Sequence, residues 1–85
     1  MTAAIGTYIT SVTAGTNNNK LVIKTDATGT QVATEAAGWT GALSAAVIDN
    51  TGAAKTTGAV ATTDSLLVVA EDGTAYTFVI NAVNG

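Results

Sequence analysis

Apolar and polar residues alternate with a period of two along most of this chain, and this pattern predicts β-strands. The clearest signals are the apolar run 65–70 and the alternating run 74–83. Asp72 and Gly73 stand between them, and Asp-Gly is a preferred pair in hairpin turns. We therefore expect an antiparallel hairpin here, as the structural centre of the chain.

Earlier segments show the same period less clearly. In the first of them, the alternation directs Ile5 and Ile9 to one face and Tyr8 and Val12 to the other. Clusters of Asn, Gly and Asp, which favour turns, separate the segments. The further strands are expected at 3–13, 20–25, 43–49 and in a short return through about residue 57, and the turns at 14–19, 26–29 and 50–52.

Residues 30–37 are the helix candidate of the chain. Thr30 can serve as N-cap and Gly38 as the residue after the C-cap. The helix would have about two turns, so packing has to stabilise it. Three apolar residues at helical spacing would share its buried face: Val32, Ala36 and Trp39.

These elements predict a single domain covering residues 1–85. We expect a mainly β fold, an antiparallel sandwich-like domain of about six strands with one short helix near residues 30–37. The alternative is an α+β fold with a single antiparallel sheet. A chain of 85 residues buries only about 60% of its unfolded surface, and without Cys no disulfide supplements that thin core.

Charge and composition exclude several function classes. The net charge is −3, with Lys20, Lys24 and Lys55 as the cations, so the chain cannot neutralise the phosphates of a typical nucleic-acid contact. Every apolar run is interrupted well before the ~18 residues of a membrane span, so we expect no membrane insertion. The chain opens with Met and shows no signal peptide, which suggests a complete small gene product.

Catalytic and metal-binding chemistry is poorly represented. The absence of His and Cys removes the commonest general base and the thiol nucleophile, so we expect no enzyme, no cofactor and no metal. Asp49, Asn50 and Gly52 resemble a fragment of a calcium loop, and Glu71 and Asp72 are adjacent carboxylates. We interpret both groups as turns, and the sequence leaves open a weak calcium site there.

The stretch TTDSLLVVAEDGTAYTFVI (62–80) resembles the closing hairpin of cadherin-like or immunoglobulin-like β modules, which occur in bacterial surface proteins and in phage virion proteins. Segments 29–32 and 47–58 lie where such modules have a helix-opening turn and a hairpin. The resemblance implies adhesion, spacing or assembly, and it supplies no catalytic residue.

Few charges protect segment 6–15, and unprotected strand edges pair with other chains. We therefore expect protein partners, either further copies or a capsid or surface lattice. The leading hypothesis is a small bacteriophage virion protein that decorates or cements a capsid, located in the virion. The alternative is an adhesion or spacer module at the bacterial cell surface. The candidate interface residues are Ile5, Tyr8, Ile9 and Trp39, and for Trp39 a place in the core is the favoured interpretation.

Overall fold

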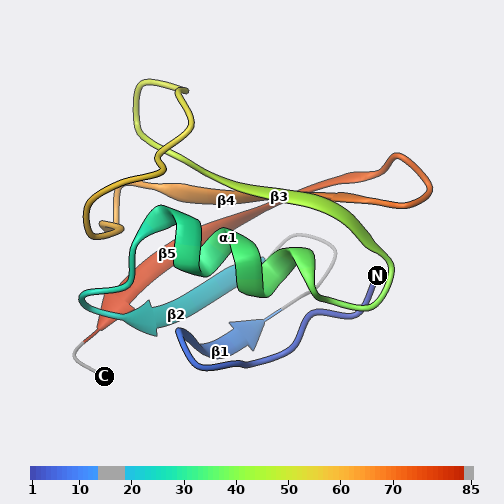
Figure 1. Ribbon diagram of the computed structural model, residues 1–85, viewed down its shortest axis with the longest axis horizontal. Coiled ribbons are helices and arrows are strands. Elements are labelled where there is room, and N and C mark those ends of the chain that lie inside the picture. Colours follow the sequence, from blue (N-terminus) through green and yellow to red (C-terminus); the bar gives the residue numbers. More distant parts are fainter. Residues whose placement is uncertain (14–18, 84–85) are drawn as a thin grey trace.

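A computed structural model of the protein describes residues 1–13 and 19–83, which form one mixed β-sheet and one helix (Figure 1). The strands lie in the order β1-β2-β5-β4-β3. A mainly β fold with one short helix is therefore confirmed. The elements are β1 (Ile9–Thr13), β2 (Lys20–Lys24), α1 (Gly29–Ala37), β3 (Ala42–Ile48), β4 (Ser65–Ala70) and β5 (Ala75–Val83).

The predicted hairpin of 65–70 and 74–83 is confirmed as β4 and β5. The strands pair antiparallel, with Ser65 opposite Val79. Gly73 takes a φ of +88°, which glycine adopts without strain, and its N–H donates to the carbonyl of Ala70 at 2.9 Å. Local alternation and turn chemistry are thus sufficient to specify this part of the fold.

The expected antiparallel sandwich is not what the described strands form: they lie in a single mixed sheet whose neighbours β2 and β5 run parallel. Helix α1 crosses from β2 to the far edge of the sheet, where β3 begins. The antiparallel series β3, β4, β5 then returns towards β2, so that β2, β3 and β5 all point the same way. The alternation of apolar and polar residues indicates which face of the sheet a side chain occupies. It does not indicate whether the neighbouring strand runs parallel or antiparallel.

The expected strand through about residue 57 is also wrong. After β3, the chain returns along this strand only as far as an isolated bridge between Ile48 and Ala54, with the N–H of Lys55 donating to the carbonyl of Val47 at 2.7 Å. Lys55 then forms an ion pair with Asp64, at 2.9 Å between Nζ and Oδ2. This contact ties the connection to the residue before β4.

The helix expected at 30–37 is present, but its N-cap is Thr28 rather than Thr30. The Thr28 hydroxyl accepts from the backbone N–H of Gln31 at 3.3 Å, and the Gln31 side chain accepts from the backbone N–H of Thr28 at 2.9 Å. This reciprocal pair is a capping box. Gly38 ends the helix as its C-cap, with a right-handed φ of −83°.

The hydrophobic core lies between α1 and one face of the sheet. Trp39 contacts Phe78 edge to face, with ring centroids 5.5 Å apart. The predicted buried face of the helix is confirmed, since Val32, Ala36 and Trp39 are all buried. The other large members of the core are Ile9, Leu21, Ile23, Val47, Val60, Leu66, Val68, Phe78 and Ile80.

Candidate protein interaction surface

Strand β4 is apolar on both of its faces. Leu66 and Val68 point towards α1 and are fully buried. Leu67 and Val69 alternate with them and therefore lie on the opposite face, where each is half-buried. Strands with apolar residues at every position are typical of sheets covered on both sides.

The second face of the sheet, called the open face below, carries apolar side chains interspersed with polar ones. Among the described elements, none packs over this face, and Val79 of β5 is 52% exposed on it. The neighbouring Thr77 and Asn81 of β5 are exposed as well. The large apolar residues assigned to the open face are Val22, Ile48, Leu67, Val69 and Val79.

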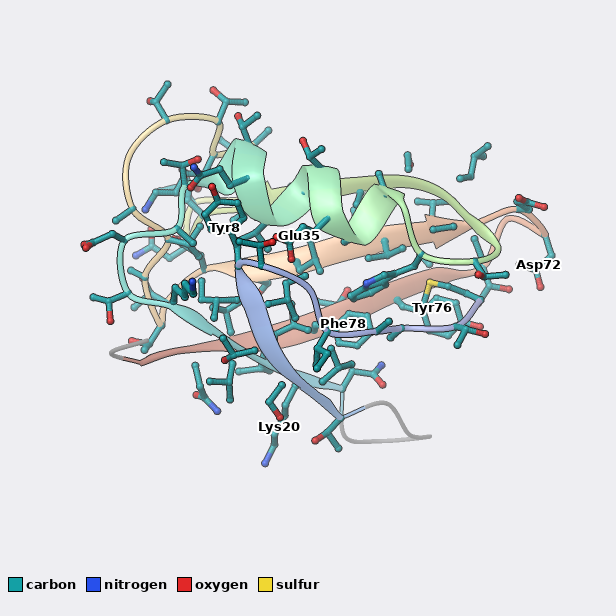
Figure 2. The ribbon with its side chains drawn as sticks, turned by 60° about the horizontal axis from the view of Figure 1, so that its bottom comes forward. Tyr8, Lys20, Glu35, Asp72, Tyr76 and Phe78 are labelled. Atoms are coloured by element: carbon teal, nitrogen blue, oxygen red, sulfur yellow. The ribbon has the colours of Figure 1, made fainter. Side chains whose placement is uncertain are left out.

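One row of residues crosses the open face over four strands. Lys20 of β2 lies opposite Val79 of β5, Val79 lies opposite Ser65 of β4, and Ser65 lies opposite Ile48 of β3. Because directly paired residues project to the same side, all four belong to the open face. Figure 2 shows Lys20 projecting from the side of the sheet opposite α1.

The charge of the open face is confined to one side. Lys20 and Lys24 share it with Val22 on β2, while the third lysine, Lys55, is paired with Asp64. The carboxylates of Asp49, Glu71 and Asp72 occur in the connections after β3 and β4 instead. Figure 2 shows Asp72 at the tip of the β4–β5 hairpin, far from Lys20.

The N-terminal arm, residues 1–8, is held against α1 by three side chains of the helix region. The Glu35 carboxylate accepts from the backbone N–H groups of Tyr8 at 2.6 Å and Ile9 at 3.1 Å. The indole N–H of Trp39 donates to the carbonyl of Ala4 at 2.9 Å. The Tyr8 hydroxyl accepts from the side-chain amide of Gln31 at 3.0 Å, next to Glu35 in Figure 2.

The four predicted interface residues are therefore neighbours, but most of their surface faces the chain itself. Ile9 is fully buried and Trp39 is only 7% exposed, both in the core. Tyr8 is half-buried, so Ile5, at 69% exposure, is the member of the set that is available to a partner. Their role in an interface stays a prediction.

Strand β1 lies at an edge of the sheet, as the open segment 6–15 suggested, but it is short and irregular. Its register shifts between Ile9 and Ser11, so Ile9 and Val12 both face the core. The predicted strand 3–13, with those two residues on opposite faces, is therefore wrong in its first half and in its alternation. A bulge and the Glu35 contacts protect this edge where charges do not. Part of the expected turn at 14–19 lies outside the described residues.

The carboxylates of Asp49 and Asp72 accept hydrogen bonds from residues of their own turns. Asp49 accepts from the hydroxyl and N–H of Thr51 and from the N–H of Ala53, and these hydrogen bonds, that of the Thr51 hydroxyl first, lower the pKa of Asp49. The N–H of Thr74 lowers the pKa of Asp72 in the same way. Within residues 1–13 and 19–83, no group of three or more possible metal ligands occurs.

Two hollows flank the helix. One, of about 240 Å³, lies between α1 and β3 and is lined by small residues such as Ala33, Ala37 and Ala45. The other, of about 280 Å³, lies between the N-terminal arm and the end of α1, where Glu35 and Trp39 contribute to its wall. The Glu35 carboxylate there already accepts two backbone hydrogen bonds, so the hollow presents no free acid–base pair.

Comparisons with protein-family profiles, curated proteins and solved structures found no match to this chain. In the described part of the chain, no helix is both long and apolar enough to cross a membrane. The open face was not predicted from the sequence. The run SLLVVA of β4 could have indicated it, because Leu66 and Val68 make one face of the strand apolar and Leu67 and Val69 the other.

Proposed function

We propose that this protein is a non-enzymatic structural protein that assembles with other proteins through the open face of its sheet. The observation that carries the proposal is the double-sided apolar character of β4, combined with a helix that covers one side. Extended exposed apolar patches with polar rims are typical of protein–protein contacts.

The energetics favour a covered state. Fully burying an aliphatic side chain contributes about 1.5–3 kcal/mol, and the open face carries five such side chains that are only partly buried. Val79 has the most to gain, because about half of its surface contacts water. A protein partner that completes this burial supplies a second layer over β4 and β5, which the described part of the chain does not provide.

The specific form of the proposal is a small bacteriophage virion protein that decorates or cements a capsid. Its support is the composition: 11% charged residues, with many small Ala, Thr and Gly side chains. Small side chains lose little conformational entropy when an interface forms. Contacts of this kind depend weakly on salt, as expected for a protein held permanently on a particle.

A spacer module of a surface protein is the second candidate, and the arrangement of the chain favours it. Met1 and the end of β5 lie at opposite sides of the molecule in Figure 1. Modules connected in this way would form an extended string. In that case the open faces would contact neighbouring modules of the string rather than a capsid.

Site-specific photo-cross-linking tests the proposed function. A photoreactive phenylalanine analogue replaces Thr77, which is exposed on the open face, and a control carries it at Thr34, which is exposed on α1. In cells or particles that contain the protein, we expect covalent protein adducts from position 77 well above those from position 34. Equal yields from the two positions would contradict the proposal.

A further inference from the structure

We infer that the partner of the open face is a protein surface that carries a pair of carboxylates beside an aliphatic patch, and that its carboxylates bind Lys20 and Lys24. This inference rests on the proposed function and names the chemistry of the partner at the same surface. Three observations carry it: the sign of the charge on the open face, the position of Lys20 next to Val79, and the lack of an acidic partner for either lysine in the described part of the chain.

All charged residues in the strands lie on the open face, and all of them are positive. Strands β1 to β5 contain two charged residues, Lys20 and Lys24 of β2. Both alternate with buried residues of this strand, Leu21 and Ile23, and therefore project to the open face. The six carboxylates of the chain lie in α1 and in the connections between elements. The net charge of the chain is −3, so this face is positive on a protein that is acidic elsewhere.

A partner that buries Val79 also covers Lys20. The two residues lie directly opposite each other on neighbouring strands, which are about 4.8 Å apart in a sheet. Val79 is the most exposed of the five large apolar residues of the face. Lys20 is exposed beside it (Figure 2), and Lys24 is already half-buried further along β2. The aliphatic contact and the contact with the lysines therefore belong to one surface.

Neither lysine has an acidic partner within residues 1–13 and 19–83. The ion pair found there joins the third lysine, Lys55, to Asp64. Covering Lys20 and Lys24 therefore removes two unpaired charges from water, which is unfavourable unless the covering surface supplies opposite charges and hydrogen-bond acceptors. Carboxylates supply both. The charge of the open face thus selects an acidic surface among the protein surfaces that could cover its apolar residues.

The spacing of the lysines indicates the spacing of the carboxylates. Lys20 and Lys24 are four residues apart on one strand, which places their Cα atoms about 13 Å apart. Val22 lies between them on the same face, and Val79 and Leu67 lie on the next two strands. The fitting surface therefore has two Asp or Glu side chains at a similar separation, with aliphatic residues between and beside them. Complementary charges of this kind determine which partner binds and in which orientation, while apolar burial supplies most of the affinity.

Other occupants fit this charge pattern less well. A second copy packed face to face would present the same two lysines and no carboxylate. Nucleic acid contacts typically neutralise roughly six to ten phosphates. The open face offers two cations, and Tyr76 and Phe78 of β5 pack on the core side, where bases cannot stack on them. An anionic membrane attracts clusters of about four to eight basic residues. Two lysines among aliphatic side chains therefore favour an acidic protein.

The photoreactive analogue at Thr77 also tests the chemistry of the partner, because Thr77 lies two positions before Val79 on the open face. We combine it with Lys20→Glu and expect the yield of protein adducts to fall about tenfold or more, since two like charges would then face each other. Lys20→Arg keeps the charge and should retain the wild-type yield. An unchanged yield with Lys20→Glu would overturn the inference.

A matched pair of variants separates the local charge from the net charge. Lys20→Gln removes one positive charge from the open face, and Thr34→Glu adds one negative charge on α1, so both lower the net charge by one. We expect Lys20→Gln to lower the adduct yield from position 77 several-fold and Thr34→Glu to leave it unchanged. Urea unfolding of each purified variant verifies that the fold is retained. Equal effects of the two variants would overturn the inference.

Mass spectrometry of the adducts identifies the bound surface. We expect a protein segment with Asp or Glu close to the cross-linked residue, and replacing that carboxylate by Lys should restore the adducts lost in Lys20→Glu. Such a rescue requires direct contact between the two charges and cannot arise from a misfolded variant. Adducts with a second copy, with nucleic acid, with lipid, or with a protein segment that lacks carboxylates would overturn the inference.

The inference and the proposed function fail in different ways. If position 77 of the wild type forms protein adducts well above those from position 34, but their yield does not depend on Lys20, the acidic partner is wrong and the proposed function stands. If position 77 forms no adducts above those from position 34, both are wrong.

Discussion

The Glu35 carboxylate accepts a 2.6 Å hydrogen bond from the backbone N–H of Tyr8, a residue 27 positions earlier in the chain. A second bond, from the N–H of Ile9, makes the contact bidentate. Glu35 therefore links the last turn of α1 to the beginning of β1. A side chain satisfies the backbone here, where the register of β1 is irregular.

Replacing Glu35 by Gln tests this contact. The amide group of Gln can accept through one atom only, so it leaves one of the two backbone N–H groups without its partner. We expect a loss of about 1–3 kcal/mol in the free energy of unfolding, measured by urea denaturation. The control is Glu71→Gln at the exposed hairpin tip, which should change stability by less than about 0.5 kcal/mol. Equal effects would show that Glu35 does not hold the arm.

Gly29 opens α1 in close contact with the connection after β3. A Cβ atom at this position would lie 1.8 Å from the carbonyl oxygen of Lys55, so a backbone segment would have to move. We expect Gly29→Ala to lower stability by about 1–3 kcal/mol or more, in a thermal or urea unfolding experiment.

Gly38→Ala is the matched control at the other end of α1. Its added Cβ would lie 3.4 Å from the nearest atom, and its φ of −83° suits any residue. The substitution also restricts the unfolded chain, so we expect no loss, or a gain of about 0.4–1 kcal/mol. A larger loss at Gly38 than at Gly29 would contradict the packing described for the helix.

The Lys55–Asp64 ion pair is predicted to be important for stability, because Asp64 is only 3% exposed. In Lys55→Met, the Asp64 carboxylate would retain its bond from the N–H of Ala61 but lose its counter-charge. We expect the free energy of unfolding to fall by about 3 kcal/mol. This value lies at the lower end of the range for a broken buried ion pair, because Lys55 itself is partly exposed. The double variant Lys55→Met with Asp64→Asn should be the more stable of the two. If the single and the double variant are equally stable, the unpaired charge of Asp64 is not the cause of the loss in Lys55→Met.

We expect the protein to lose stability on acidification, because the carboxylates of Asp49 and Asp72 in the two acidic turns become protonated. Hydrogen bonds hold the folded-state pKa of Asp49 and that of Asp72 below the ordinary value of 3.8. Their contribution is therefore present in full above that value and is lost as the pH falls through the lower folded-state values. Unfolding curves between neutral pH and about pH 2 should show this decline.

The variant Asp49→Asn separates titration from turn geometry. Asn keeps the side-chain oxygen that accepts from Thr51 and Ala53, but it does not titrate. We expect a smaller decline in stability on acidification than in the wild type. An unchanged decline would assign the pH dependence to other carboxylates.

The sequence predicted the elements whose signals are local. The β4–β5 hairpin follows from alternation around Asp72 and Gly73, and the helix from its spacing of apolar residues. The N-cap was misplaced by two residues although Thr28 and Gln31 have the spacing of a capping box, three positions apart. That pattern could have identified the helix start.

Non-local features could not be predicted in this way. The parallel pairing of β2 with β5 joins segments about sixty residues apart, and the bulge after Ile9 reverses the alternation of β1. The candidate interface was sought in the first strand, whose low charge suggested an open edge. The structure shows Ile9 in the core, and Val79 of the central strand β5 is 52% exposed on the face that α1 does not cover.

Photo-cross-linking from position 77 tests most directly the claim that another protein covers the open face. The account predicts covalent protein adducts from position 77 well above those from position 34 on α1. Equal yields from the two positions, or no adducts from either, would contradict it.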